Sequence, residues 1–100
     1  MAQTFIAGKI TKVEPVETKS NYSSQRIEIT VQEFDPSSGE PKTPSVFPLM
    51  IFNKNIAALA ASTFLDKSVI AKCYLKSIPS EKDGKTYHNI GLNTVELKAV

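Results

Sequence analysis

Hydrophobic and polar residues alternate most regularly between residues 26 and 34, which read RIEITVQEF. Successive side chains of an extended strand point to opposite faces, so Ile27, Ile29 and Val31 share one face and polar residues share the other. This period of two predicts a strand with one buried face and one solvated face.

Four more segments rich in β-branched and aromatic residues also predict strands, at residues 4–13, 45–52, 68–78 and 86–97. Gly8 and Gly91 lie inside two of them, and a glycine within a strand is typical of a bulge or a bend. Pro48 has no backbone N–H, so its strand should be unpaired or bulged on one side at that point.

The segment at residues 45–52, SVFPLMIF, is apolar on both faces. One row of side chains must pack in the core, and the other then lies on a surface that a ligand or a second subunit covers. The alternation does not say which row is which, so both interpretations stay open. The two rows are Phe47, Leu49 and Ile51 on one side, and Val46, Pro48, Met50 and Phe52 on the other.

The period changes to that of a helix over residues 53–65, which read NKNIAALAASTFL. Either Asn53 or Asn55 can cap its first turn. Apolar residues at helical spacing predict the face that meets the core, with Phe64 as the main contact. These residues are Ile56, Leu59, Ala60 and Phe64.

The predicted elements follow one another as strand, strand, strand, helix, strand, strand. Residues 16–25 and 35–44 are rich in Ser, Asn, Pro or Gly, and predict a mobile connection and a loop. Asp83-Gly84 predicts a tight hairpin turn with positive φ between the last two strands. This order favours an all-β fold, a five-stranded Greek-key oligonucleotide/oligosaccharide-binding (OB) barrel. An SH3-like barrel and an unclassified α+β sheet are the alternatives.

Length and composition are those of a small globular protein. The chain has 100 residues, 41% of them hydrophobic and 22% charged, which predicts one folded domain over residues 1–100 and excludes a disordered chain. No apolar run approaches the roughly 20 residues that span a membrane, and the N-terminal segment lacks a signal-peptide pattern. We therefore expect a cytoplasmic protein with no membrane partner.

Few residues offer catalytic or metal-binding chemistry. One cysteine, Cys73, and one histidine, His88, allow no internal disulfide and make a structural zinc site unexpected. His88 would have to serve any nucleophile–base pair, and we interpret it as a partly exposed strand residue. Cys73 alternates with apolar residues and is expected in the core. The sequence therefore predicts no enzyme, no cofactor and no metal.

The charge is compatible with a polyanionic ligand. The chain carries a net charge of +2, and residues 51–100 hold seven Lys against four Asp or Glu. In the strand at residues 68–78, Lys72, Tyr74 and Lys76 share the solvated face, with an aromatic ring between two cations. Cations that follow a backbone and flat side chains that stack on bases are what single-stranded nucleic acid requires.

The two loops that flank the ligand groove of an OB barrel carry the same residue types. The connection after the first strand contains Lys19 and Tyr22, and the last hairpin contains Lys82, Lys85 and Tyr87. The loops and the solvated strand face therefore indicate the same kind of ligand.

Four segments resemble the bacterial and phage single-stranded DNA-binding proteins of the OB fold: FIAGKITKVEP, VFPLMIFNKNIAALA, LDKSVIAKCYL and DGKTYHNIGLNTVEL, which together span most of residues 4–98. The resemblance implies sequence-tolerant binding of single-stranded DNA. Phe52 and Lys54 match the family's Phe and Lys at the junction of strand and helix, where the Phe lies in the DNA-binding surface. Tyr87 matches the hairpin tyrosine.

The chain also departs from this family. It has no tryptophan, and Val46 stands where the third strand would carry one. The acidic tail of the bacterial members has no counterpart after the last strand. The sequence therefore fits a minimal or phage-encoded member of this family better than the standard bacterial protein. Members form dimers or tetramers, which the apolar row on the third strand would allow here.

Our first hypothesis is a non-enzymatic single-stranded DNA-binding protein that acts in replication, recombination or repair, with RNA left open as a ligand. The alternative is an OB-fold module for protein interaction or assembly without nucleic-acid affinity. A homo-oligomer through an apolar strand face is compatible with both. The expected phosphate contacts are Lys12, Lys19, Arg26, Lys54, Lys72, Lys76, Lys82 and Lys85, and the expected stacking residues are Tyr22, Phe52, Tyr74 and Tyr87.

Overall fold

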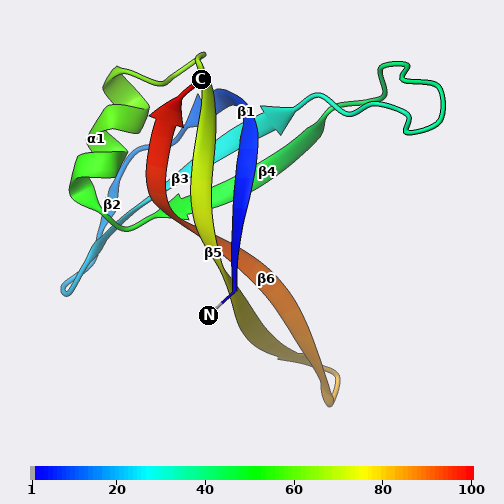
Figure 1. Ribbon diagram of the computed structural model, residues 1–100. Coiled ribbons are helices and arrows are strands. Elements are labelled where there is room, and N and C mark those ends of the chain that lie inside the picture. The colour runs from blue at the N-terminus through cyan, green and yellow to red at the C-terminus, as the bar shows by residue number, and fades with distance from the viewer. Residues whose placement is uncertain (1) are drawn as a thin grey trace.

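The computed structural model describes residues 2–100, which contain six strands and one helix (Figure 1). Five strands close into a ring in the order β1-β5-β6-β4-β3, because β1 pairs with β3 as well as with β5, and β2 extends the sheet beyond β3. The predicted OB-fold barrel, with its helix after the third barrel strand, is confirmed. The elements are β1 (Gln3–Val13), β2 (Glu17–Thr18), β3 (Ser23–Val31), β4 (Ser45–Ile51), α1 (Lys54–Ser62), β5 (Ser68–Lys82) and β6 (Lys85–Ala99).

Strand β1 closes the barrel by pairing with β5 through residues 3–9 and with β3 through residues 9–13. We expected a bulge or bend at Gly8. No bulge lies there, because Gly8 pairs in register with Val69 and the register shift lies between Ile10 and Lys12, whereas β1 changes its partner strand at the next residue, Lys9. The glycine serves a close approach instead. A Cβ atom at Gly8 would lie 2.6 Å from the carbonyl oxygen of Thr30 on β3.

The alternating pattern of β3 predicted its faces correctly, since Ile27 and Ile29 are fully buried. In β4 the structure decides the open question of the two rows. Leu49 and Ile51 are buried, whereas Val46 is 53% exposed. The row that contains Phe47 therefore packs in the core, and the row that contains Phe52 faces outward. Closure of the barrel determines this choice, which alternation within one strand cannot.

The predicted consequence of Pro48 is also observed. Strand β4 pairs with β3 along its whole length, and Glu28 lies opposite Pro48. It pairs with β6 only at Met50 and Ile51. One edge of β4 is therefore unpaired at the proline.

Helix α1 begins directly after Asn53, whose side-chain Oδ1 accepts hydrogen bonds from the backbone N–H groups of Asn55, at 2.9 Å, and Ile56, at 3.2 Å. Asn53 is thus the cap, one of the two predicted. The helix ends at Ser62, three residues before the predicted end.

The helix meets the barrel through small side chains. Ala57 and Ala60 are buried, whereas Leu59, which we expected in the core, is 45% exposed. Phe64 lies beyond the helix end and packs against the core, so its predicted contact is confirmed although its helical position is wrong. Within residues 2–100, the helix lacks the length and apolarity that crossing a membrane requires.

Residues 16–25, predicted as a mobile connection, form a short hairpin instead. Glu17 and Thr18 of β2 pair with Ser24 and Ser23 of β3. The backbone N–H of Lys19 donates to the carbonyl oxygen of Tyr22 at 2.7 Å and closes the turn. The paired residues of this hairpin are all polar and show no apolar alternation, so the pattern hid the pairing.

Strands β5 and β6 form a long two-stranded ribbon that projects from the barrel (Figure 1). Its turn is the predicted one, with φ of 54° at Asp83 and 74° at Gly84. Strand β5 continues to Lys82, four residues beyond the predicted end, because the ribbon keeps its pairing up to the turn. Gly91 pairs in register, and the only shift in the ribbon leaves Val95 without a partner.

Candidate nucleic-acid interface

One face of the β5–β6 ribbon carries six of the residues that the sequence analysis singled out. Residues directly opposite one another in an antiparallel pair share a face, and side chains alternate along each strand. Tyr87 lies opposite Ser80, and Lys85 lies opposite Lys82. Both therefore share the face of the even-numbered residues of β5. We call this set the ribbon stripe: Lys72, Tyr74, Lys76, Lys82, Lys85 and Tyr87.

The acids on the paired parts of β5 and β6 lie off the ribbon stripe, which leaves that part of the stripe cationic, and Asp83 belongs to the turn between Lys82 and Lys85. Glu81 pairs with Thr86 on the opposite face. Glu96 lies opposite Lys72, but its carboxylate is 3.0 Å from the Nζ atom of Lys98. Directly opposed like charges destabilise a strand pair, as at Lys82 and Lys85, and an anion bound between them would relieve the repulsion.

Three aromatic residues gather where the ribbon meets the barrel, and we call them the aromatic corner: Tyr22, Phe52 and Tyr74. The rings of Tyr22 and Phe52 meet edge to face, with centroids 5.9 Å apart at an interplanar angle of 65°. Phe52 and Tyr74 also line one surface cavity of about 410 Å³. Tyr22 and Phe52 are 53% and 46% exposed, so both rings are accessible to a stacking partner.

Two of the predicted cations lie in a balanced charge cluster on β1 and β3. The guanidinium of Arg26 is 3.7 Å from a carboxylate oxygen of Glu14 and 3.7 Å from one of Glu28. Lys12 is 4.0 Å from Glu14. The cations of these pairs are about half exposed, and such solvent-accessible ion pairs contribute little to stability. They do reduce the positive field that Lys12 and Arg26 present to a phosphate.

The remaining two predicted cations lie near the aromatic corner. Lys19 belongs to the turn that holds Tyr22. Lys54, the first residue of α1, lines a second cavity together with Phe52. The structure thus brings ten of the twelve predicted residues to the ribbon stripe, the aromatic corner and their edge, and places Lys12 and Arg26 in the balanced cluster.

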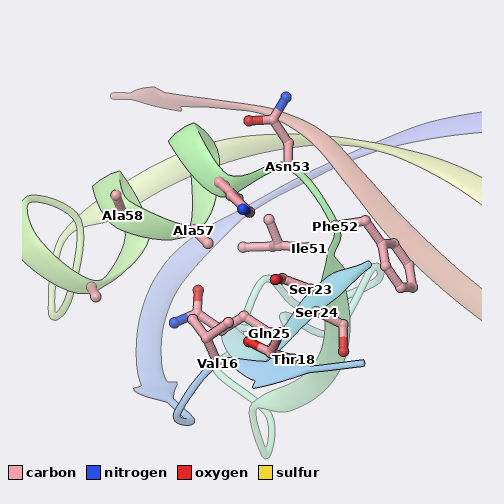
Figure 2. Close-up of a pocket in the computed structure, with 12 residues that line it drawn as sticks. Val16, Thr18, Ser23, Ser24, Gln25, Ile51, Phe52, Asn53, Ala57 and Ala58 are labelled. Atoms are coloured by element: carbon pink, nitrogen blue, oxygen red, sulfur yellow. The ribbon is translucent and has the colours of Figure 1, made fainter. Parts of the chain in front are cut away.

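The second cavity contains a residue that the sequence analysis missed. It has a volume of about 350 Å³ and lies between α1 and the β2–β3 hairpin (Figure 2). Gln25 lines it and is only 3% exposed. We had assigned Gln25 to a loop, although it precedes the buried Ile27 by two residues, and this spacing was the available signal for an inward side chain.

The described residues offer little reactive chemistry. Within residues 2–100, no three His, Cys, Asp or Glu side chains gather closely enough to hold a metal ion. Burial raises the pKa of the Cys73 thiol, and a hydrogen bond with Thr94 opposes this shift. His88 pairs with Pro79 on the opposite face from the ribbon stripe, and its Nδ1 lies 3.3 Å from Ser77 Oγ.

Comparisons with known proteins bear on the fold. No family model and no curated protein matches the sequence. Among solved structures, the mitochondrial single-stranded DNA-binding protein Rim1 of S. cerevisiae is 14% identical with a TM-score of 0.76, over 99% of this chain and 94% of that one. The small single-stranded DNA-binding protein of Streptomyces coelicolor is 14% identical with a TM-score of 0.65, over 98% and 93%.

A third solved structure, the Plasmodium falciparum SSB in complex with single-stranded DNA, is 10% identical with a TM-score of 0.73, over 100% of this chain and 95% of that one. All three matches run over nearly the whole of both chains at low identity. Such likeness is carried by the backbone rather than by the residues of a site. The chain therefore has the OB fold of these single-stranded DNA-binding proteins.

Proposed function

We propose that the chain is a non-enzymatic protein that binds single-stranded DNA with little sequence preference, and that it protects or organises such DNA in replication, recombination or repair. One observation carries the proposal. The ribbon stripe continues into the aromatic corner through Tyr74, which belongs to both. The likeness of the fold to single-stranded DNA-binding proteins supports it.

The arrangement supplies both interactions that a single strand needs. Lys76, Lys82 and Lys85 contact the phosphates, while Tyr74 and Tyr87 stack on bases. Each stacked base contributes about 1–3 kcal/mol, and this gain tolerates every sequence because every base has a flat face. Residues 72–82 of β5 extend over roughly 33 Å at about 3.3 Å per residue, which provides a path for several nucleotides.

Titration of a labelled oligo(dT) at low and at high salt tests the proposal. We expect binding at low salt that weakens steeply as salt rises, because phosphate contacts release counterions. Replacing Tyr87→Ala should weaken binding by about 1–3 kcal/mol, or roughly 5- to 150-fold in Kd. His88→Ala is the matched control, since it alters the adjacent residue on the other face.

Failure to bind oligo(dT) at low salt would overturn the proposal and favour the protein-interaction module. Equal losses in the Tyr87 and His88 variants would show that the ribbon stripe is not the contact surface. An oligo(U) competitor of equal length measures the preference between DNA and RNA.

We further propose that copies of the chain associate and act in the cytoplasm. An apolar groove of about 620 Å³ lies where β4 and the ribbon diverge, and Phe47, Leu75 and Leu92 line it. Phe5 and Ile90, at its edge, are 61% and 72% exposed. Exposed apolar patches of this kind support association. Analytical ultracentrifugation should show a dimer or tetramer for the wild-type protein and a monomer for Ile90→Asp. A monomeric wild-type protein would contradict the proposed association.

A further inference from the structure

The cavity between α1 and the β2–β3 hairpin contains a buried hydrogen-bond acceptor with no partner. The Nε2 atom of Gln25 donates to the carbonyl oxygen of Glu14 at 3.1 Å. Its Oε1 atom accepts no hydrogen bond. Figure 2 shows the carboxamide extending from β3 toward Ala57 on α1.

The orientation of this amide is determined by its surroundings. Exchange of the two amide atoms would place Oε1 against the Glu14 carbonyl, where two acceptors would repel each other. The oxygen must therefore lie on the other side. A buried acceptor without a donor costs free energy, and a bound group that supplies an N–H would remove this cost.

The rest of the cavity suits a flat, mainly apolar ligand with polar edges. Its walls include Val16, Ala58 and Ala61, and hydroxyl groups come from Thr18 and Ser24. Its volume of about 350 Å³ lies at the lower end of the range for small-ligand sites. Val16 is half exposed and belongs to the link before the two-residue strand β2, so this wall is held by few contacts.

Two further residues connect the cavity to the proposed DNA surface. Phe52 lines it and also belongs to the aromatic corner. Lys54 lines it as well and supplies a cation to the strand that enters. A strand that stacks on Phe52 therefore runs past the entrance of the cavity.

We propose that this cavity takes one nucleobase of the bound single strand, and that Gln25 Oε1 accepts a hydrogen bond from an N–H group of that base. The inference rests on the proposed function. Cytosine and adenine offer an exocyclic amino group for this bond, guanine offers an amino and an imino N–H, and thymine offers its imino N–H. The site therefore accepts every natural base and discriminates against a base that has lost its donor.

The test compares two 12-mers, oligo(dC) and the same strand built from 2-pyrimidinone, a cytosine analogue without the 4-amino group. The wild-type protein should bind oligo(dC) roughly 3- to 10-fold more tightly, the value of one hydrogen bond to a buried neutral acceptor. Gln25→Met removes the acceptor at similar volume, so the ratio of the two Kd values should fall to about 1. Melting temperatures verify that the variant is folded.

A second pair of variants carries the test if Gln25→Met does not fold. Ala61→Leu fills the cavity from the exposed side of α1 and should also bring the ratio of the two Kd values to about 1. The helix should tolerate this change because alanine and leucine are both strong helix formers. Ser62→Leu adds similar bulk at the neighbouring position outside the cavity and should keep the wild-type ratio.

The outcomes separate this inference from the proposed function. Loss of all oligonucleotide binding by the wild-type protein would overturn the proposed function. Binding of both 12-mers with equal Kd by the wild-type protein, or a ratio that survives Gln25→Met and Ala61→Leu, would overturn only the nucleobase site.

Discussion

Gly8 and Gly91 both lie inside long strands, but an added side chain would meet different neighbours at the two positions. At Gly8 a Cβ atom would lie 2.6 Å from the backbone oxygen of Thr30, which cannot move without disturbing β3. At Gly91 it would lie 2.9 Å from Cδ1 of Ile78, the end of a flexible side chain that is 48% exposed.

We therefore predict that Gly8→Ala lowers the free energy of unfolding by about 1–3 kcal/mol, as overpacking does. Gly91→Ala should change it by less than about 0.5 kcal/mol, because Ile78 can rotate away. Urea unfolding followed by circular dichroism measures both. Similar losses in the two variants would contradict the explanation by backbone contact at Gly8.

Local alternation predicted much of the structure at the scale of single residues. The buried faces of β3 and β5 and the turn at Asp83-Gly84 all follow from neighbouring residues in sequence. Gln25 was missed because its polar side chain and the polar residues before it indicated a loop, although it continues on β3 the inward parity of Ile27 and Ile29. Leu59 was placed wrongly because the barrel meets α1 through alanines, and helical spacing does not reveal which side of a mostly apolar helix is covered.

At the scale of elements, the junction of β4 and α1 joins the two proposed ligand sites. Asn53 caps the helix directly after Phe52 and directly before Lys54. We predict that Asn53→Ala lowers stability by about 0.5–2 kcal/mol, because two backbone N–H groups at the start of the helix lose their acceptor. Thermal unfolding measures this loss.

Asn55→Ala is the matched control for the cap, since it removes an asparagine from the same turn without removing the cap acceptor. It should leave stability unchanged or raise it slightly, because alanine has the higher helix propensity. If Asn55→Ala lowered stability more than Asn53→Ala does, the Asn53 cap would not be what stabilises the start of the helix.

At the scale of the whole molecule, the cations divide into balanced and unbalanced groups. Lys12 and Arg26 are paired with acids, whereas Lys82 and Lys85 face each other on the ribbon. The net charge of +2 conceals this difference. The sequence predicted the residue types of the candidate site, but their separation into two groups depends on the register between strands.

We predict that replacing both Lys82 and Lys85 with glutamine reduces the dependence of affinity on salt. If each lysine neutralises one phosphate, the slope of log K against log salt should fall in magnitude by about 1.4, at about 0.7 per phosphate of a single strand. Replacing Lys42 and Lys67, which lie outside the ribbon stripe, should leave the slope as it is. If the two double variants gave the same slope of log K against log salt, Lys82 and Lys85 would not be phosphate contacts.

The two pairings of β1 also bear on how the chain is made. Gln3 pairs with Tyr74, and β1 cannot complete its pairing with β5 until β3, β4, α1 and β5 have all been synthesised. Pairings this distant in sequence slow folding, whereas the adjacent strands β5 and β6 can pair as soon as their turn forms. Among the barrel strands, the one that is synthesised first is therefore among the last to become stable.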